Sequence, residues 1–201
     1  NQKRVINLPD NSNSLLFLCD WGGEAITVLQ TLITSKTRIK LLLKFFLNIQ
    51  NRGYLKKLEV EFADSSNGIR LELNRLEEAG LLVSQLQGNK KMYQANTHNA
   101  IYKELHSLLL KHTGIDQVID QVLNQLGELQ SAYLTGALAR GIDAHKIEIL
   151  LIGDLNESYL QQLITKAEGL IQKKITYRVY NSLEFQIQKE GSPIIIFNNN
   201  K

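Results

Sequence analysis

The stretch DSSNGIRLELNRLEEAGLLVSQLQGNKKMYQAN, residues 64–96, decides the fold. Its first part predicts a helix, because three apolar residues recur at spacings of four and three and share one face: Ile69, Leu73 and Leu76. The side chains of residues 64–66 suit the start of a helix, and Gly80 suits the left-handed position just after its end. Two short strands, 81–86 and 92–95, should follow, joined by a basic turn at 87–90.

Two further helices are expected ahead of this stretch. Ser35 is a suitable N-cap for the first. Its inward residues should be Ile39, Leu42, Leu43, Phe46 and Leu47, with Lys36, Arg38, Lys40 and Lys44 mostly on the other face. After a turn at 51–53, the second helix should span 54–62. The order is thus three helices and a hairpin.

The remainder of the chain has a different pattern. An amphipathic helix is expected at 99–112, with Ile101, Leu105, Leu108 and Leu109 inward, and it could link the two halves or mediate dimerisation. Another helix should follow at 115–126. After Gly127 we expect strands at 130–134, 147–152, 175–180 and 193–197, alternating with helices at 157–171 and 183–188. This alternation is typical of a small α/β domain.

We therefore expect a two-domain chain of mixed α+β and α/β class. Residues 1–27 form an N-terminal extension of uncertain structure, and residues 28–97 the first domain. Residues 98–114 form a linker helix, and residues 115–201 the second domain.

Positive charge is concentrated in the first domain. Residues 36–96 hold eleven basic and six acidic residues, a net charge of +5, whereas residues 97–201 hold ten basic and eleven acidic residues. A local basic excess is typical of a nucleic-acid-binding face, although a solvated basic face with a protein partner remains the alternative.

Several other classes of protein lack support. No apolar run approaches the roughly 20 residues that cross a bilayer, and the apolar run 15–19 is too short for a signal peptide. The single cysteine, Cys19, excludes an internal disulfide framework and suits a reducing cytoplasm. The four histidines lack metal-ligand spacing, and no P-loop or nucleophile-elbow motif is present. We expect a cytoplasmic protein without a membrane segment, metal or cofactor.

The third helix, capped by residues 64–66 and ended by residues 79–80, has the residue types that read DNA. Arg70 can form two hydrogen bonds with a guanine, and Asn67 or Asn74 can pair with an adenine edge. Phosphate contacts are expected from the helix start and from nearby cations, namely Ser65, Ser66, Arg38, Lys56, Lys57, Lys90 and Lys91.

Four segments carry a family resemblance: SKTRIKLLLKFF (35–46), GYLKKL (53–58), LNRLEEAGLL (73–82) and GNKKMYQAN (88–96). Together they resemble the ArsR-like winged helix-turn-helix transcription regulators. The resemblance implies an N-terminal winged helix that binds double-stranded DNA. A homodimer is expected as well, because paired half-sites are the usual route to adequate affinity for such small modules. In one group of these proteins a nucleotidyltransferase-like domain follows, and this chain continues in the same way.

The segment YLTGALARGIDAHKIEILLIGDL, residues 133–155, looks like the signature of minimal nucleotidyltransferases. In that family a Gly-Ser loop grips the nucleotide, and an Asp-x-Asp pair on the next strand holds divalent metal ions. Here Gly136 matches, but Ala137 replaces the serine and Lys146 the first aspartate, and Glu148 matches the second only in charge. A cation at the first position repels a metal.

We therefore expect a small C-terminal nucleotidyltransferase-like α/β domain that is not an enzyme and serves ligand sensing or assembly. Gly136, Arg140, Lys146 and Glu148 could bind a nucleotide or another phosphate-bearing effector. One alternative is an active nucleotidyltransferase that acts on a small molecule, a protein or RNA. Another is a protein-interaction module whose winged helix no longer meets DNA.

Overall fold

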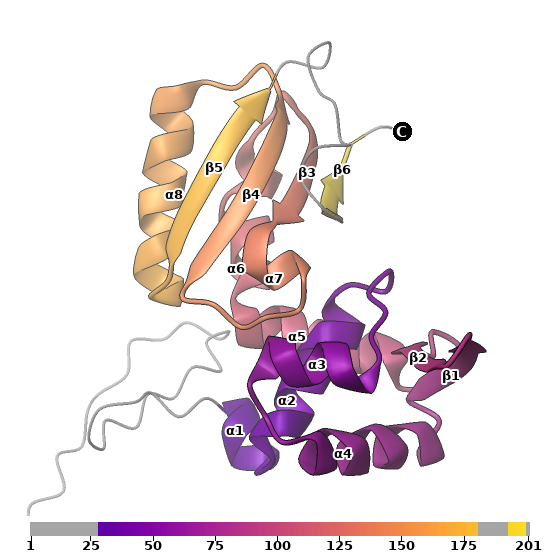
Figure 1. Ribbon diagram of the computed structural model, residues 1–201. Helices are drawn as coiled ribbons and strands as arrows, with labels where there is room; N and C mark the ends of the chain where they lie inside the picture. Colours follow the sequence, from indigo (N-terminus) through magenta and orange to yellow (C-terminus); the bar gives the residue numbers. More distant parts are fainter. Residues whose placement is uncertain (1–27, 181–192, 200–201) are drawn as a thin grey trace, which may run out of the picture.

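A computed structural model of the chain describes residues 28–180 and 193–199. It combines α-helices with two separate β-sheets, one of two strands and one of four (Figure 1). The expected mixture of helices and strands is confirmed. The expectations for the extension 1–27 and for a helix at 183–188 lie outside the described residues. Within the ranges that are described, no helix is both long and apolar enough to cross a membrane.

Residues 28–95 make up the helical part of the molecule. Its elements are α1 (Val28–Leu32), α2 (Lys36–Leu42), the π-helical turn η1 (Leu43–Leu47), α3 (Leu55–Phe62), α4 (Ser66–Glu78), β1 (Leu82–Gln87) and β2 (Lys90–Ala95). Both expected N-caps are confirmed: the Ser35 Oγ accepts a hydrogen bond from the Arg38 N–H, and the Ser65 Oγ from the Gly68 N–H, each at 3.2 Å. The hairpin turn is tighter than expected, because the paired strands leave only Gly88 and Asn89 between them.

Residues 115–198 make up the sheet part. Its elements are α6 (Ile115–Gln121), the 3-10 turn η2 (Leu123–Gln125), β3 (Leu129–Thr135), α7 (Gly136–Ala139), β4 (Lys146–Gly153), α8 (Glu157–Ile171), β5 (Lys174–Tyr180) and β6 (Ile194–Asn198). The strand order is β5-β4-β3-β6, with β4 and β5 parallel and the other pairs antiparallel. The parallel pair is connected through α8, which begins and ends at the expected residues.

Helix α5 (Tyr102–Thr113) lies between the two parts. Of the four residues expected to face inward, Leu109 is buried and Leu105 packs partly against the core, whereas Ile101 and Leu108 are 51% and 37% exposed. The inward face is shifted by about one residue because His106 and Tyr102 contact η1. The His106 Nδ1 lies 2.7 Å from the Phe46 carbonyl oxygen, and the centroids of the Tyr102 and Phe46 rings are 5.8 Å apart.

The helical and sheet parts meet where residues 139–141 pack against η1. The Asn48 amide donates to the Ala139 carbonyl oxygen at 3.1 Å, and the Lys44 Nζ donates to the Arg140 carbonyl oxygen at 2.8 Å. A Cβ on Gly141, whose φ is +75°, would lie 2.2 Å from the Lys44 Cα. The buried apolar cluster runs without a break from Leu29 to Ile175, so both parts share one core.

The expectation that Lys44 faces solvent is wrong. The helical pattern placed it on the solvent-facing side, but its side chain is only 5% exposed and its Nζ lies 2.5 Å from the Glu61 Oε1. The sheet part covers Lys44, because its Nζ donates to the Arg140 carbonyl oxygen. The periodicity of one helix cannot predict a contact with a segment so distant in the chain.

Replacing Gly141 by alanine should destabilise the protein. The left-handed φ alone costs an alanine roughly 1–2 kcal/mol, and the clash with η1 adds to this loss. Gly169→Ala is the matched control: Gly169 lies within α8 with no atom near its Cβ direction, so that change should stabilise by about 0.5–1 kcal/mol. Urea unfolding measures both, and a Gly141→Ala variant as stable as wild type would contradict the close approach.

Candidate nucleic-acid interface

Helix α4 has one buried face and one exposed face. Ile69, Leu73 and Leu76 are 0%, 1% and 5% exposed, which confirms the expected inward stripe. The opposite face is exposed and consists of Asn67, Arg70, Leu71, Asn74, Arg75 and Glu78. Among the residues that the structure describes, Asn67, Arg70 and Asn74 have no hydrogen-bond or ion-pair partner. Their polar groups are therefore available to a ligand.

Glu72 anchors α4 to α2. Its carboxylate is buried, accepts hydrogen bonds from the Arg38 Nε at 2.8 Å and the Ser35 Oγ at 2.9 Å, and lies 3.6 Å from the Arg75 Nη1. Burial raises the pKa of Glu72, but the bonds from Arg38 and Ser35 and the charges of Arg38 and Arg75 outweigh it, so the pKa lies below the usual 4.5. Arg38, expected at a DNA phosphate, is thus engaged within the protein.

The turn between α3 and α4 is held by a second cation of α2. The Lys40 Nζ donates to both carboxylate oxygens of Asp64 at 3.0 Å and to the Phe62 carbonyl oxygen at 2.9 Å. Between these residues, Ala63 adopts a left-handed conformation with φ of 52°. Because the turn sets the angle between α3 and α4, these bonds fix how far α4 projects from the surface.

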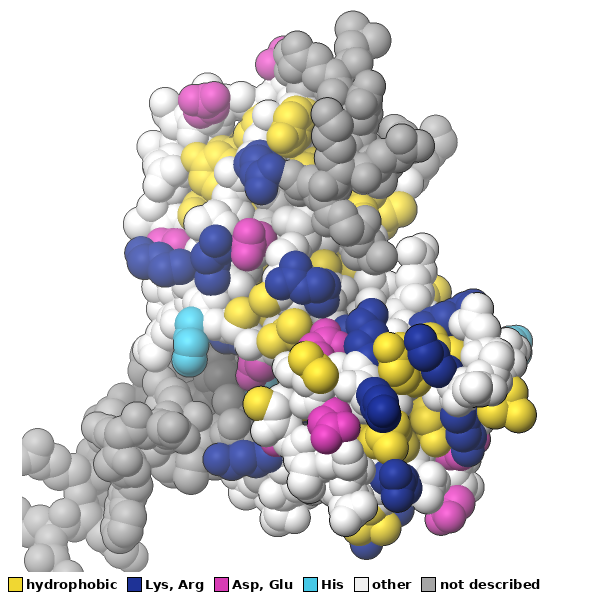
Figure 2. Space-filling view, in the orientation of Figure 1, with side chains coloured by type: hydrophobic (Ala, Val, Ile, Leu, Met, Phe, Trp, Pro, Cys, Tyr) yellow, Lys and Arg dark blue, Asp and Glu magenta, His cyan; other side chains and the backbone are white. Residues whose placement is uncertain are grey.

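Further cations surround the start of α3 and the tip of the hairpin. Lys56 and Lys57 are exposed in the first turn of α3, and the Lys90 Nζ lies 4.6 Å above the ring of Tyr54, the N-cap residue. In Figure 2, Lys and Arg side chains gather over this region beside apolar patches.

Lys91 differs from its neighbour Lys90. Its Nζ forms an ion pair with the Glu77 Oε2 at 2.6 Å, and the Ser84 hydroxyl also donates to Glu77. The hydrogen bond from Lys91 is the main reason that the pKa of Glu77 lies below its usual range. Of the two lysines expected at the hairpin tip, Lys91 is therefore paired, whereas Lys90 has no acidic partner among the residues that the structure describes.

A second candidate site lies at the start of α7. Gly136 has a φ of +68°, and the Glu148 side chain lies over it so closely that a Cβ on Gly136 would be 2.4 Å from the Glu148 Oε1. The Lys146 Nζ is 3.6 Å from the other carboxylate oxygen of Glu148. Three of the four expected ligand-binding residues thus come together, while the exposed Arg140 follows at the end of α7. A carboxylate occupies the space over the glycine, so a bound phosphate would have to displace it.

No group of three or more His, Cys, Asp or Glu side chains in residues 28–180 and 193–199 is arranged to hold a metal ion. A scan against models of protein families finds no match to this chain, and a search of curated proteins finds none either. Function must therefore be inferred from the residues and their geometry.

Glu72→Gln should lower the free energy of unfolding by roughly 1–3 kcal/mol at pH 7, because the buried bonds to Arg38 and Ser35 lose their charge. The folded-state pKa is depressed, so this contribution is present above about 4.5 and disappears as the pH falls through the folded-state pKa. The difference between wild type and variant should therefore narrow on acidification.

Urea unfolding at a series of pH values measures this difference. Glu78→Gln, at an exposed position of the same helix, is the matched control and should leave both stability and its pH dependence nearly unchanged. A difference that stayed constant down to low pH would show that the Glu72 charge is not responsible.

Proposed function

We propose that this protein is a DNA-binding transcription regulator, with a winged helix-turn-helix at residues 28–97 that places α4 in the major groove. One observation carries the proposal: within the described part of the chain, the exposed face of α4 presents Asn67, Arg70 and Asn74 without hydrogen-bond partners, on a helix tied to α2 through Glu72 and through Asp64 just before its start. Polar side chains on a rigid helix are what base readout requires, because each base pair offers a distinct pattern of donors and acceptors in the major groove.

The contacts divide into two kinds. Arg70 suits a guanine, and the two asparagine amides suit adenine edges. Lys56, Lys57 and Lys90 are exposed and have no acidic partner in the described part of the chain, so they suit phosphates, with Ser65 and Ser66 at the start of α4. Arg38 and Lys91 are expected to contribute less, because each is already paired with a glutamate.

The sheet part fits a catalytically degenerate nucleotidyltransferase-like domain that serves ligand sensing or assembly. Two observations support this. Lys146 stands where the family has a metal-binding aspartate, and it pairs with Glu148, the remaining carboxylate. We expect the regulator to act as a homodimer, because two modules on adjacent half-sites gain the affinity that one small module lacks.

Arg70→Ala should weaken binding to the preferred duplex by roughly 1–3 kcal/mol and relax the choice of base at one position. Arg70→Lys is the matched variant: it keeps the charge but loses the two-pronged geometry, so it should retain non-specific affinity and lose discrimination. Selection from a random duplex pool, followed by fluorescence anisotropy, measures both effects. The proposal fails if wild-type protein shows no salt-dependent affinity for any duplex.

Lys90→Ala should weaken binding to all duplexes alike and reduce the slope of log affinity against log salt by about 1. Lys166→Ala removes the same charge from an exposed position on α8 and should change neither quantity. Anisotropy titrations at several salt concentrations make the comparison. Equal slopes for the two variants would remove Lys90 from the interface.

A further inference from the structure

The turn formed by residues 139–141 of the sheet part is held by the helical part. The carbonyl oxygens of its first two residues accept hydrogen bonds from three side chains: Asn48, Asn51 and Lys44. Asn48 and Lys44 are buried, and the proposed DNA contacts use none of the three. These bonds form a junction between the two parts of the molecule, and two segments lead from it towards the elements that face the proposed DNA.

Lys44 connects the junction to α3. Its Nζ donates to the Arg140 carbonyl oxygen at 2.8 Å and to the Glu61 Oε1 at 2.5 Å. Glu61 lies in the last turn of α3, two residues before Ala63, whose left-handed conformation begins the turn into α4. A displacement of the Arg140 carbonyl group therefore reaches the end of α3 through a single ammonium group. From there it reaches α4, which packs against α3.

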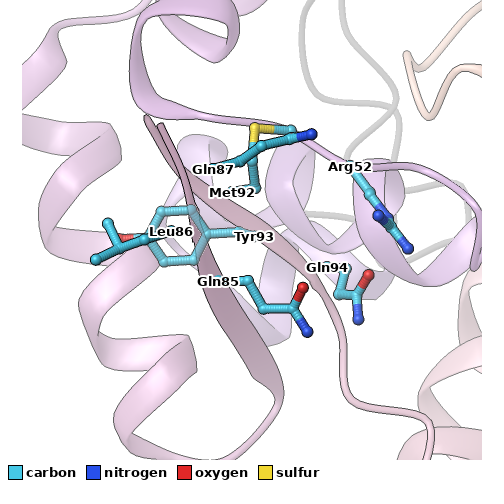
Figure 3. A pocket seen from close by; sticks show the side chains of 7 residues that line it. All are labelled: Arg52, Gln85, Leu86, Gln87, Met92, Tyr93 and Gln94. Atoms are coloured by element: carbon cyan, nitrogen blue, oxygen red, sulfur yellow. The ribbon is translucent and has the colours of Figure 1, made fainter. Parts of the chain in front are cut away.

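The loop at residues 48–53 connects the same junction to the hairpin. Its two asparagines bind the turn, and Gly53 at its end pairs with Tyr93 of β2 through backbone hydrogen bonds of 3.1 Å and 2.8 Å. Arg52, next to Gly53, lines a hollow of about 140 Å³ on the hairpin together with Gln85 and Gln94 (Figure 3). The loop is thus fixed at both ends, so a shift of the turn reaches the hairpin as well.

The junction combines close packing with unfavourable local structure. Residues 43–47 form the π-helical turn η1, a rare form that is frequent at functional sites. The Glu61 Oε2 is buried and has no hydrogen-bond partner within residues 28–180 and 193–199, so an arrangement in which a donor reached it would be favoured. Gly141 leaves no space between the turn and η1. Because packed interfaces move between discrete arrangements rather than deforming gradually, a change on one side of the junction is passed to the other.

We propose that Lys44 is a positioning residue through which the sheet part sets the orientation of α3 and α4, and with it the affinity for DNA. The Arg140 carbonyl oxygen holds the ammonium group, and the ammonium group holds Glu61. A ligand or partner that moves residues 139–141 therefore changes the affinity for DNA without touching the DNA. The effect on DNA affinity rests on the proposed function, whereas the coupling between the two parts does not.

The test is a cycle of variants on the two sides of the junction. Gly141→Ala disturbs the turn from the sheet side. Lys44→Met/Glu61→Gln removes the ion pair and leaves no buried charge without a partner. Each change should weaken binding to a duplex selected with wild-type protein roughly two- to thirtyfold. The slope of log affinity against log salt should stay the same, because neither change removes a phosphate contact. The combination should bind about as weakly as the weaker of the two, since no link remains to be broken.

Lys40→Met/Asp64→Asn is the matched control. Lys40 lies one helical turn before Lys44, and its partners, Asp64 and the Phe62 carbonyl oxygen, belong to the helical part. This variant should weaken DNA binding by itself, but its effect should multiply with that of Gly141→Ala, as expected for independent sites. Urea unfolding shows which variants fold. Where Gly141→Ala does not, Ala139→Gly loosens the same turn without a clash and replaces it in every comparison.

Backbone hydrogen exchange provides a second readout that needs no DNA. With Lys44 and Glu61 in place, Gly141→Ala should speed exchange in α3 and in the turn into α4, because those segments lose their support from the sheet part. In the Lys44→Met/Glu61→Gln background the same change should have no further effect there. A Lys44 that only stabilised the fold would let Gly141→Ala act equally in both backgrounds.

Two outcomes overturn the inference. In one, Gly141→Ala changes affinity and exchange by the same factor with and without the ion pair. In the other, the folded Gly141→Ala variant changes neither quantity. In both cases the regulator proposal stands. If wild-type protein binds no duplex at all, the proposed function fails, and the exchange measurement alone decides whether Lys44 couples the two parts.

Discussion

Three ion pairs along one helix hold α3, α4 and the turn between them in place. Arg38, Lys40 and Lys44 on α2 and η1 pair with Glu72, Asp64 and Glu61, which lie on α4, on the turn before it and on α3. The partners lie on α4 itself, on the turn before it and on α3, so the orientation of α4 depends on this helix. Lys44 is the most buried of the three cations. Removing one partner of a buried pair leaves a charge without compensation, at a cost of roughly 3–5 kcal/mol.

The same helix also determines how the sheet part sits. The Lys44 ammonium donates to the Glu61 Oε1 and to the Arg140 carbonyl oxygen, while Asn48 and Asn51 donate to the Ala139 carbonyl oxygen. The backbone of residues 139–141 is therefore engaged in packing. The Glu148 carboxylate likewise occupies the space over Gly136.

The sequence predicted well the features that depend on residues close together in the chain. Serine caps at Ser35 and Ser65, the glycine after α4 and the apolar stripes of α4 and α8 depend on residues within a few positions of one another. The buried position of Lys44 and the shifted face of α5 could not be read in this way. Both arise from contacts with elements far away in the chain, η1 with residues 139–141 and α5 with Phe46.

The sequence by itself determined most of the order of elements, although not α1 and α7, the basic character of the first half and the residues that α4 exposes. It could do so because helix periodicity, capping and charge are properties of neighbouring residues. Only the tertiary structure decided which cations remain free. Arg38 and Lys91 are held by glutamates, whereas Arg70 and Lys90 have no acidic partner among residues 28–180 and 193–199. It also brought Arg52 beside Gln85 and Gln94, because the pairing of Gly53 with Tyr93 joins segments about forty residues apart.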